Sequence, residues 1–395
     1  MKRKISLMIS LALTLALLFA LASPSFAALS QDGKLQFNED GKFTILQVAD
    51  TQDIFIANAA TISALNKALD AVKPDLVVFT GDNISGSGCF GTLLTEMAID
   101  AIAAPVEARG IPFTLVFGNH DDEGSVSKDE QLKMYQKYEN CVAFDAVPEM
   151  YGSGTHNLPI LSSDGAKDVY NLWLIDSGSY NVDPGASGYD YVHDDQVQWY
   201  VETSNALKAA NGGTPLPSLA FQHIAVPEIF MIYNETTPGA KDSRNYFGRD
   251  LALELNPAMA SGHLGEWSCP PNVASSEFAA MAVQGDVKGI VTGHDHVNDF
   301  IGTYQGIDFI QSPGIGYFSY GDAAVRGVRV IELDENDTSS YKTHTITNTE
   351  LFGDSITGKV VGLNDNLSYL GYPISLTVFC KGLVARLFDW LKLFC

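Results

Sequence analysis

The sequence predicts an α/β fold, in which helices cover a β-sheet. From Phe43 onward, short runs of β-branched and aromatic residues alternate with helical patterns. Groups of Asp, Asn and His residues come directly after several of these runs. In open α/β sheets, ligands bind beyond the carboxyl ends of the strands. The chain of 395 residues is long enough for one large domain, or for one domain with a small appendage.

The alternation begins with three strands and three helices. Residues 43–49, 76–79 and 113–117 are expected to be strands, and residues 57–72, 92–108 and 129–138 helices. Further on, strands are expected at 169–175 and 216–221, a helix near 196–209, a short apolar run at 289–292, and hairpin strands at 300–310 and 325–333.

Two segments lack a regular pattern. Residues 140–168 are rich in Gly, Ser, Asn and Pro, which predicts a long surface loop of the kind that covers substrate pockets. Residues 227–276 are irregular and carry aromatic and cationic side chains. This second segment is a candidate surface for substrate selection, although each of its side chains alone is expected in a solvated loop.

The N-terminus has the pattern of a secretory signal. Lys2, Arg3 and Lys4 precede an apolar run that ends before Pro24, and small residues lead to a cleavage position after Ala27. The run is near the lower length limit for a membrane span, which disfavours a retained anchor. The sequence therefore predicts a signal peptide at 1–27, a main domain at 28–350 and a secreted or extracytoplasmic protein.

The remaining residues, 351–395, form a C-terminal extension. In its last part Lys381, Arg386, Asp389 and Lys392 are spaced so that their charges lie along one face of an otherwise apolar helix. Packing of this amphipathic helix on the domain is one expectation. Contact with a membrane surface, or self-association, is the other.

Charge and cysteine content exclude several classes of protein. The formal net charge of −23 leaves no broad basic footprint for nucleic acid. An enzyme with this negative net charge would need cations at its active site in order to bind an anionic substrate. No cysteines have the CxxC spacing of zinc or thioredoxin-like sites. In an oxidising compartment, two of the three residues Cys89, Cys141 and Cys269 could form one disulfide.

The candidate site residues follow the expected strands. The stretch Gly293-His294-Asp295-His296 places two imidazoles one residue apart, which cannot share a helix face but can diverge at a strand end. The residues that follow the other expected strands supply carboxylate, amide and imidazole groups: Asp50 and Gln52, Asp82, Asn119, and His223. Such a mixed oxygen and nitrogen set suits Mn, Fe or Zn, and it holds more ligands than one ion needs.

Two ions sharing the Asp82 carboxylate would suit phosphoryl transfer. Paired ions about 3.5–4 Å apart clamp the attacking and leaving oxygens of a displacement, and they lower the pKa of a bound water toward 7. The expected reaction class is therefore metal-assisted hydrolysis of a phosphoester.

The ordered motifs resemble those of the calcineurin-like metallophosphoesterases. The pattern D-x-[H/Q], GD-[N], GNH-[D/E], a later His and GH-x-H appears in order over residues 43 to 333. Residues 222–228 and 293–299 look most similar to the purple-acid-phosphatase-like branch. The resemblance implies two packed mixed β-sheets flanked by helices, in a four-layer architecture.

The resemblance also implies roles for the candidate residues. Asp50 and His296 would hold the first metal, Asn119, His223 and His294 the second, and Asp82 would bridge them. His120 would face the phosphate, and Asp121 could orient its imidazole and raise its pKa. Gln52 stands where the family usually has His. Gln52 could therefore be a metal ligand or only a hydrogen-bonding residue. Ser85 stands where the purple enzymes carry a tyrosinate, so no purple colour is expected.

The implied function is a secreted dinuclear-metal phosphoesterase. It would hydrolyse phosphate monoesters of small molecules or peptides by metal-activated water, with two divalent or trivalent ions as cofactors. A phosphodiesterase on the same core, or a non-catalytic metal-stabilised binding protein, is the alternative. His120 favours an enzyme, because a binding protein does not need it.

Overall fold

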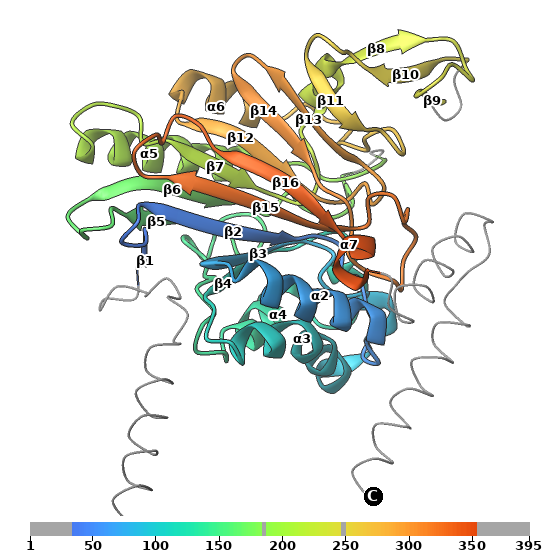
Figure 1. The fold of residues 1–395 in the computed structure, drawn as a ribbon, viewed down its shortest axis with the longest axis horizontal. Helices are drawn as coiled ribbons and strands as arrows, with labels where there is room; N and C mark the ends of the chain where they lie inside the picture. The colour runs from blue at the N-terminus through green and yellow to red at the C-terminus, as the bar shows by residue number, and fades with distance from the viewer. Residues whose placement is uncertain (1–33, 184–186, 246–249, 354–395) are drawn as a thin grey trace, which may run out of the picture.

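The computed structural model describes residues 34–183, 187–245 and 250–353. Within them, two large sheets pack face to face and helices cover both outer surfaces, as Figure 1 shows. The α/β prediction and the implied four-layer arrangement are confirmed. The predicted signal peptide at 1–27 and the predicted helix in the C-terminal extension lie outside the described residues.

The first sheet has five strands in the order β16-β15-β2-β3-β4. Its strands are β2 (Lys42–Val48), β3 (Leu76–Thr80), β4 (Phe113–Val116), β15 (Gly327–Asp334) and β16 (Lys342–Thr347). The β2, β3 and β4 strands are parallel, whereas β15 runs antiparallel to both β2 and β16. The sheet is therefore mixed, and the carboxyl ends of its three parallel strands meet at one edge.

The second sheet has eight strands in the order β1-β5-β6-β7-β12-β14-β13-β11. They are β1 (Leu35–Gln36), β5 (His156–Leu161), β6 (Asp168–Leu174), β7 (Ser218–Phe221), β11 (Ala260–His263), β12 (Val287–Thr292), β13 (Asp299–Tyr304) and β14 (Ile307–Gln311). The central strands β6, β7, β12 and β14 are parallel. This sheet too is mixed.

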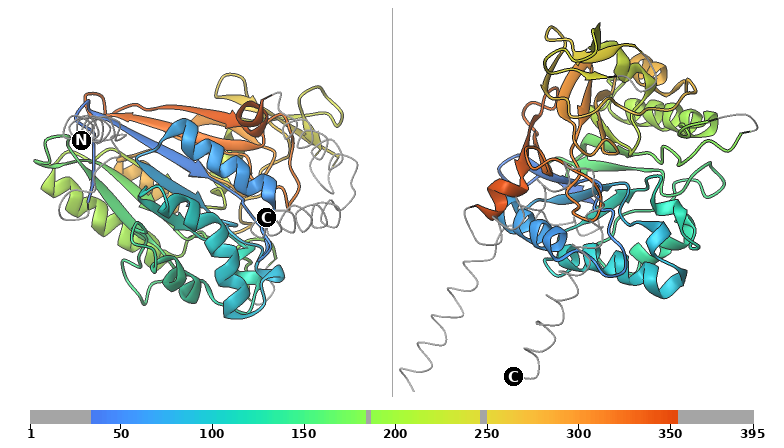
Figure 2. Two further views of the ribbon diagram at one scale, coloured as in Figure 1. Left: turned by 60° about the horizontal axis from the view of Figure 1, so that its bottom comes forward. Right: turned by 90° about the vertical axis from the view of Figure 1, so that its right-hand side faces the viewer.

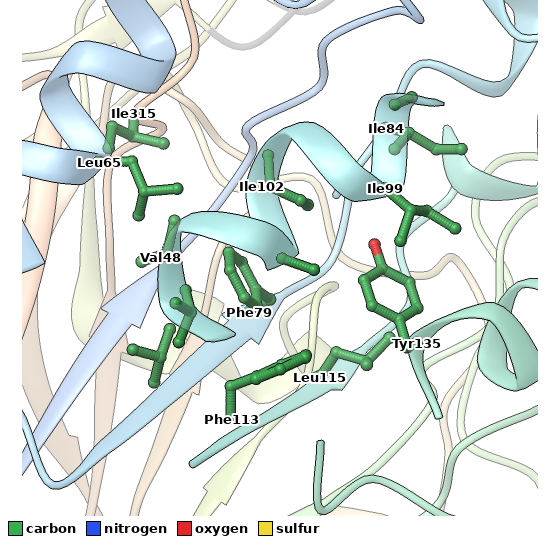
Figure 3. Packing of buried hydrophobic residues seen from close by; sticks show 14 of the residues in the cluster. Val48, Leu65, Phe79, Ile84, Ile99, Ile102, Phe113, Leu115, Tyr135 and Ile315 are labelled. Carbon is green, nitrogen blue, oxygen red and sulfur yellow. The ribbon is translucent and has the colours of Figure 1, made fainter. Parts of the chain in front are cut away.

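Three hydrophobic clusters hold the layers together. On the outer face of the five-stranded sheet lie α2 (Ala59–Val72), α3 (Gly91–Glu107) and α4 (Lys128–Tyr135), and Figure 3 shows this core around Phe79 and Phe113. On the outer face of the eight-stranded sheet lie α5 (Asp194–Ala210) and α6 (Glu277–Gln284). A third cluster joins the two sheets, with Phe43 on one side and Phe221 on the other. Figure 2 shows the two helical layers on opposite sides.

Two expectations about irregular segments are wrong in part. The expected loop at 140–168 contains β5, which pairs with β6 and β1. Residues 227–276 contain η3 (Pro227–Ile232), strand β11, and a three-stranded sheet of β8 (Tyr233–Thr236), β10 (Ala252–Leu255) and β9 (Arg244–Asn245). These strands are short and carry Asn, Glu and Pro, so pairing with distant partners decides their conformation, against a weak local preference.

Several other features complete the described part of the chain. The short helices η1 (Gly86–Gly88) and η2 (Asp121–Glu123) follow β3 and β4, and α7 (Asn348–Phe352) follows β16. Cys89, Cys141 and Cys269 are free thiols, so none of these three cysteines forms a disulfide with another. Among the described helices, none combines the length and apolar character required to cross a membrane.

Candidate metal centre

Five of the seven predicted ligands, the carboxylates and the imidazoles, converge at the edge where the parallel strands of both sheets end. One group consists of Asp82, His223 and His294, and a second of Asp50, Asp82 and His296. Within each group the ligand atoms lie within 4.8 Å of one another, and every member is buried. Asp82 belongs to both groups. The arrangement therefore offers two adjacent ion sites with one shared carboxylate.

The backbone at these strand ends is strained. Asp50, Gln52, Asp82 and His294 have positive φ values of 52°, 40°, 47° and 72°. For residues other than glycine this conformation costs of order 1–3 kcal/mol, and it persists only where the surroundings determine it. Of these four residues, Asp50, Asp82 and His294 have side chains that meet in the two ligand groups.

Two motif glycines make room for the ligands. A Cβ atom at Gly81 would lie 2.5 Å from the ring of His223, and one at Gly118 would lie 2.3 Å from Asp82 Oδ1. Both distances are far below van der Waals contact. The glycines before Asp82 and Asn119 therefore allow the two sheet edges to approach closely enough to share ions.

Backbone carbonyls fix the orientation of two imidazoles. His223 donates from Nδ1 to the Thr80 carbonyl at 2.9 Å, and its Nε2 lies 3.3 Å from Asp82 Oδ2. His296 likewise donates from Nδ1 to the Tyr320 carbonyl at 3.1 Å, with Nε2 3.3 Å from Asp50 Oδ1. A metal-binding histidine usually uses its second nitrogen in this way. Nε2 is thus the ligand atom that both rings present.

The electrostatics of the centre suit bound cations. Burial raises the pKa of Asp82, but the neighbouring His223 outweighs this effect and holds the pKa below its usual range. Burial lowers the pKa of His223, but the nearby Asp82 carboxylate and the other neighbours of the ring together outweigh burial, and the net result is a pKa raised to about 9. His294 Nδ1 lies only 3.2 Å from His223 Nε2, and burial together with that neighbour keeps the pKa of His294 well below its usual value. At most one of these two imidazole rings can be charged. A bound cation would instead be coordinated by His223 Nε2 and His294 Nδ1, both unprotonated.

Three buried oxygen atoms support the fit to metal ions. Gln52 Oε1, Asp82 Oδ2 and Asn119 Oδ1 accept no hydrogen bond in the described part of the chain, although Asp82 Oδ2 lies 3.3 Å from His223 Nε2. Buried polar atoms are normally paired, and leaving one unpaired costs about 1–3 kcal/mol. Asn119 donates from Nδ2 to the Tyr180 hydroxyl at 2.9 Å, which fixes the orientation of its amide. Bound ions would satisfy all three oxygens.

His120 lies beside the two ligand groups without belonging to either. Its backbone N–H donates to Asp82 Oδ1 at 2.8 Å, and its ring Nε2 is 4.0 Å from Asp82 Oδ2. A third of its side chain is exposed, unlike the buried ligands. The imidazole can therefore contact a group that enters from solvent.

The expectation that Asp121 orients His120 is not supported by the geometry. The buried Asp121 carboxylate accepts hydrogen bonds from the backbone of Gly118 at 2.7 Å and Ile84 at 3.0 Å, and burial raises its pKa to about 7. The carboxylate against the ring belongs to Glu123, whose Oε1 lies 2.9 Å from His120 Nδ1. The 3₁₀ turn of η2 brings these positions together, because residues three apart eclipse in such a turn.

A buried polar seam joins the two sheets behind the ligands. Gln47 on β2 donates to the Thr80 hydroxyl at 2.9 Å and to the Thr292 carbonyl on β12 at 3.3 Å. Ser312 donates to Gln47 at 2.6 Å and accepts from Arg329 on β15 at 2.7 Å. Satisfied polar networks of this kind give an interface one register. The seam therefore fixes how the two ligand-bearing edges face each other.

Comparison with known proteins identifies the family. The model of the calcineurin-like phosphoesterases matches residues 43–298. The chain belongs to this family. The matched residues include every metal ligand predicted from the sequence.

Individual relatives agree with the family model. An Arabidopsis thaliana protein named probable inactive purple acid phosphatase 14 is 31% identical over 365 residues, which cover 84% of this chain and 85% of that protein. Another from the same plant, named probable inactive purple acid phosphatase 29, is 33% identical over 340 residues, with 78% and 81% covered. A crystal structure of a dimetal phosphatase from Danio rerio covers 78% of this chain and 99% of its own, at 12% identity and a TM-score of 0.46.

Proposed function

We propose that this protein is an exported dinuclear-metal phosphoesterase that hydrolyses phosphate monoesters. The observation that carries the proposal is the pair of ligand groups sharing Asp82, with the partly exposed imidazole of His120 beside them. When bound, paired cations supply an activated water near neutral pH and neutralise charge on the phosphate.

The side chains of this site have two roles: most would bind the ions, and His120 would act on the phosphate ester. Asp82 would be shared by the two ion sites, and His223, His294 and His296 would contribute ligands to them from the opposite sheet. His120 Nδ1 donates to Glu123, which leaves Nε2 directed toward the shared carboxylate. From that position Nε2 can hold a proton for the departing alcohol oxygen.

The names of the plant relatives favour a different candidate function. Three are called probable inactive purple acid phosphatases, which on this chain would correspond to a metal-stabilised binding protein. A yeast relative, 30% identical over 290 residues, is called a phosphatase. The His120–Glu123 pair supports catalysis, because metal binding alone does not need it.

Hydrolysis of two model esters tests the proposal. Protein reconstituted with Mn, Fe or Zn should hydrolyse an aryl phosphate monoester, and a chelator should abolish the reaction. An aryl phosphodiester assayed in parallel decides between the monoesterase and the diesterase alternative. Hydrolysis of neither ester by fully metal-loaded protein would leave the binding protein as the function.

Export is a separate part of the proposal. The basic and apolar residues up to Ala27 support it. N-terminal sequencing of protein recovered outside the cytoplasm should give a chain that begins at Ala28. A chain that still begins at Met1 would contradict cleavage.

A further inference from the structure

Three tyrosine rings lie against the predicted ligands, and no motif of the family pattern above includes them. Tyr180 and Tyr189 face each other across an isolated antiparallel bridge in the segment after β6, with ring centroids 5.7 Å apart. Tyr189 also contacts the ring of His294 edge-on at 4.3 Å. Tyr320, which follows β14, stacks on His296 at 4.3 Å with the planes 4° apart.

These rings border both ion sites. Tyr180 and Tyr189 contact Asn119 and His294, which are expected to hold the second ion, whereas Tyr320 contacts His296, which is expected to hold the first. The ligands are buried, but Tyr180 and Tyr320 remain 42% and 48% exposed. Part of each of these two tyrosines is therefore open to solvent beside an ion site, although Tyr189 and His296 each stack on one face of the rings.

Hydrogen bonds hold the two exposed rings in place. The Tyr180 hydroxyl accepts from Asn119 at 2.9 Å and donates to Glu123 at 3.0 Å. The Tyr320 hydroxyl donates to Glu266 at 2.9 Å, and Glu266 also accepts from the backbone of Val297. Because both hydroxyls are tied to the protein, the rings are pre-organised and a ligand would not have to order them.

We propose that Tyr180, Tyr189 and Tyr320 form a tyrosine rim that binds the leaving group of a phosphate ester containing an aromatic ring. This inference rests on the proposed function and specifies its substrate class. Aromatic rings stack on tyrosine faces with a preference beyond simple burial. The rim also has the carboxylates of Glu123 and Glu266 beside it, so an uncharged ring suits it better than an acidic phosphopeptide.

Binding of two matched phosphonates tests the tyrosine rim without requiring turnover. Phenylphosphonate and cyclohexylphosphonate have similar size, but only the first is aromatic, and neither is hydrolysed. The metal-loaded protein should bind phenylphosphonate about three- to tenfold more tightly. Calorimetry on each ligand gives the two affinities directly.

Variants of Tyr320 separate ring stacking from support of the metal ligand. Tyr320→Phe keeps the ring and should keep the preference for phenylphosphonate. Tyr320→Leu removes one of the three rings and should weaken the preference, while metal content stays at the wild-type level because His296 retains its backbone carbonyl partner. Loss of metal with an unchanged preference would instead assign Tyr320 to positioning His296, and would overturn the proposal.

The wild-type protein alone can also refute the tyrosine rim. Equal affinity for the two phosphonates, or no binding of either, contradicts it even if no variant folds. Failure of the proposed function looks different, because the phosphonates would then bind with the expected preference while aryl phosphates are not hydrolysed.

Discussion

The two sheets contribute chemically different halves of the metal centre. The five-stranded sheet supplies the candidate oxygen ligands at the ends of its parallel strands: Asp50, Gln52, Asp82 and Asn119. The eight-stranded sheet supplies imidazoles alone: His223, His294 and His296. Neither edge offers a complete site for even one ion. Metal binding should therefore stabilise the packing of the two sheets, since ions that bind only the folded state add their binding free energy to its stability.

Removal of the shared carboxylate should have the largest effect on this division. Asp82→Ala takes one ligand from both ion sites and leaves His223 without its anionic partner. We expect nearly complete loss of both metals and of activity, because loss of supporting contacts alone costs about 10–100-fold in affinity. Metal analysis after dialysis measures the effect. Asp122→Ala, an exposed carboxylate nearby, is the matched control and should keep both ions.

His120 should separate chemistry from metal binding. His120→Ala removes an imidazole that comes from the oxygen-bearing edge but belongs to neither ligand group. Turnover should fall by ~10²–10⁴-fold, as expected for loss of a general acid, while metal content stays near wild type. Steady-state kinetics and metal analysis on the same sample give both values. Loss of both metals would show that the ring supports the ligands instead.

The candidate site was more predictable from the sequence than its surroundings. Each ligand follows an apolar strand and lies in a short motif, so strand ends and motif order were enough to group residues as distant as Asp50 and His296. Glu123 was missed because its contact with His120 depends on a 3₁₀ turn that the sequence does not mark. Tyr320 was missed because only the fold brings its loop against His296.

A buried histidine away from the metal centre sharpens the comparison between the sheets. His156 on β5 donates from Nδ1 to the Gly154 carbonyl at 2.8 Å, and its Nε2 accepts from the Thr114 hydroxyl on β4 at 2.9 Å. It therefore joins the sheets as a neutral ring. Burial lowers its pKa to about 4, whereas at the metal centre the Asp82 carboxylate raises the pKa of His223.

The low pKa of His156 predicts a loss of stability in acid. Between pH 6.5 and 4 the unfolded chain binds a proton that the folded chain does not, so the free energy of unfolding falls as pH falls, by about 1.4 kcal/mol per unit. The contribution is constant above pH 6.5. His156→Gln should show a shallower slope in urea unfolding across this range. The exposed His344→Gln should keep the wild-type slope, and equal slopes in all three proteins would contradict the assignment.

The smallest expected effect concerns Gln52, where an amide stands in place of the imidazole usual in the family. Its buried Oε1 has no partner among the described residues, as expected for an oxygen that faces an ion. An amide oxygen donates more weakly than an imidazole nitrogen to Mn, Fe or Zn. The first ion should therefore be held less tightly than the second. Gln52→His should tighten it by roughly tenfold, on the scale of other changes around bound metals.

Tighter binding of the first ion need not increase turnover. A more strongly donating ligand also makes the ion a poorer acid toward its water, so the two effects oppose each other. Metal content after dialysis against a graded series of chelators, with wild type beside the variant, measures retention directly. Gln52→Leu provides the control, because it removes the oxygen while keeping the size. If all three proteins release the first ion at the same chelator strength, Gln52 lies outside the coordination sphere, and the oxygen-bearing edge then contributes Asp50 and Asp82 alone to the first site.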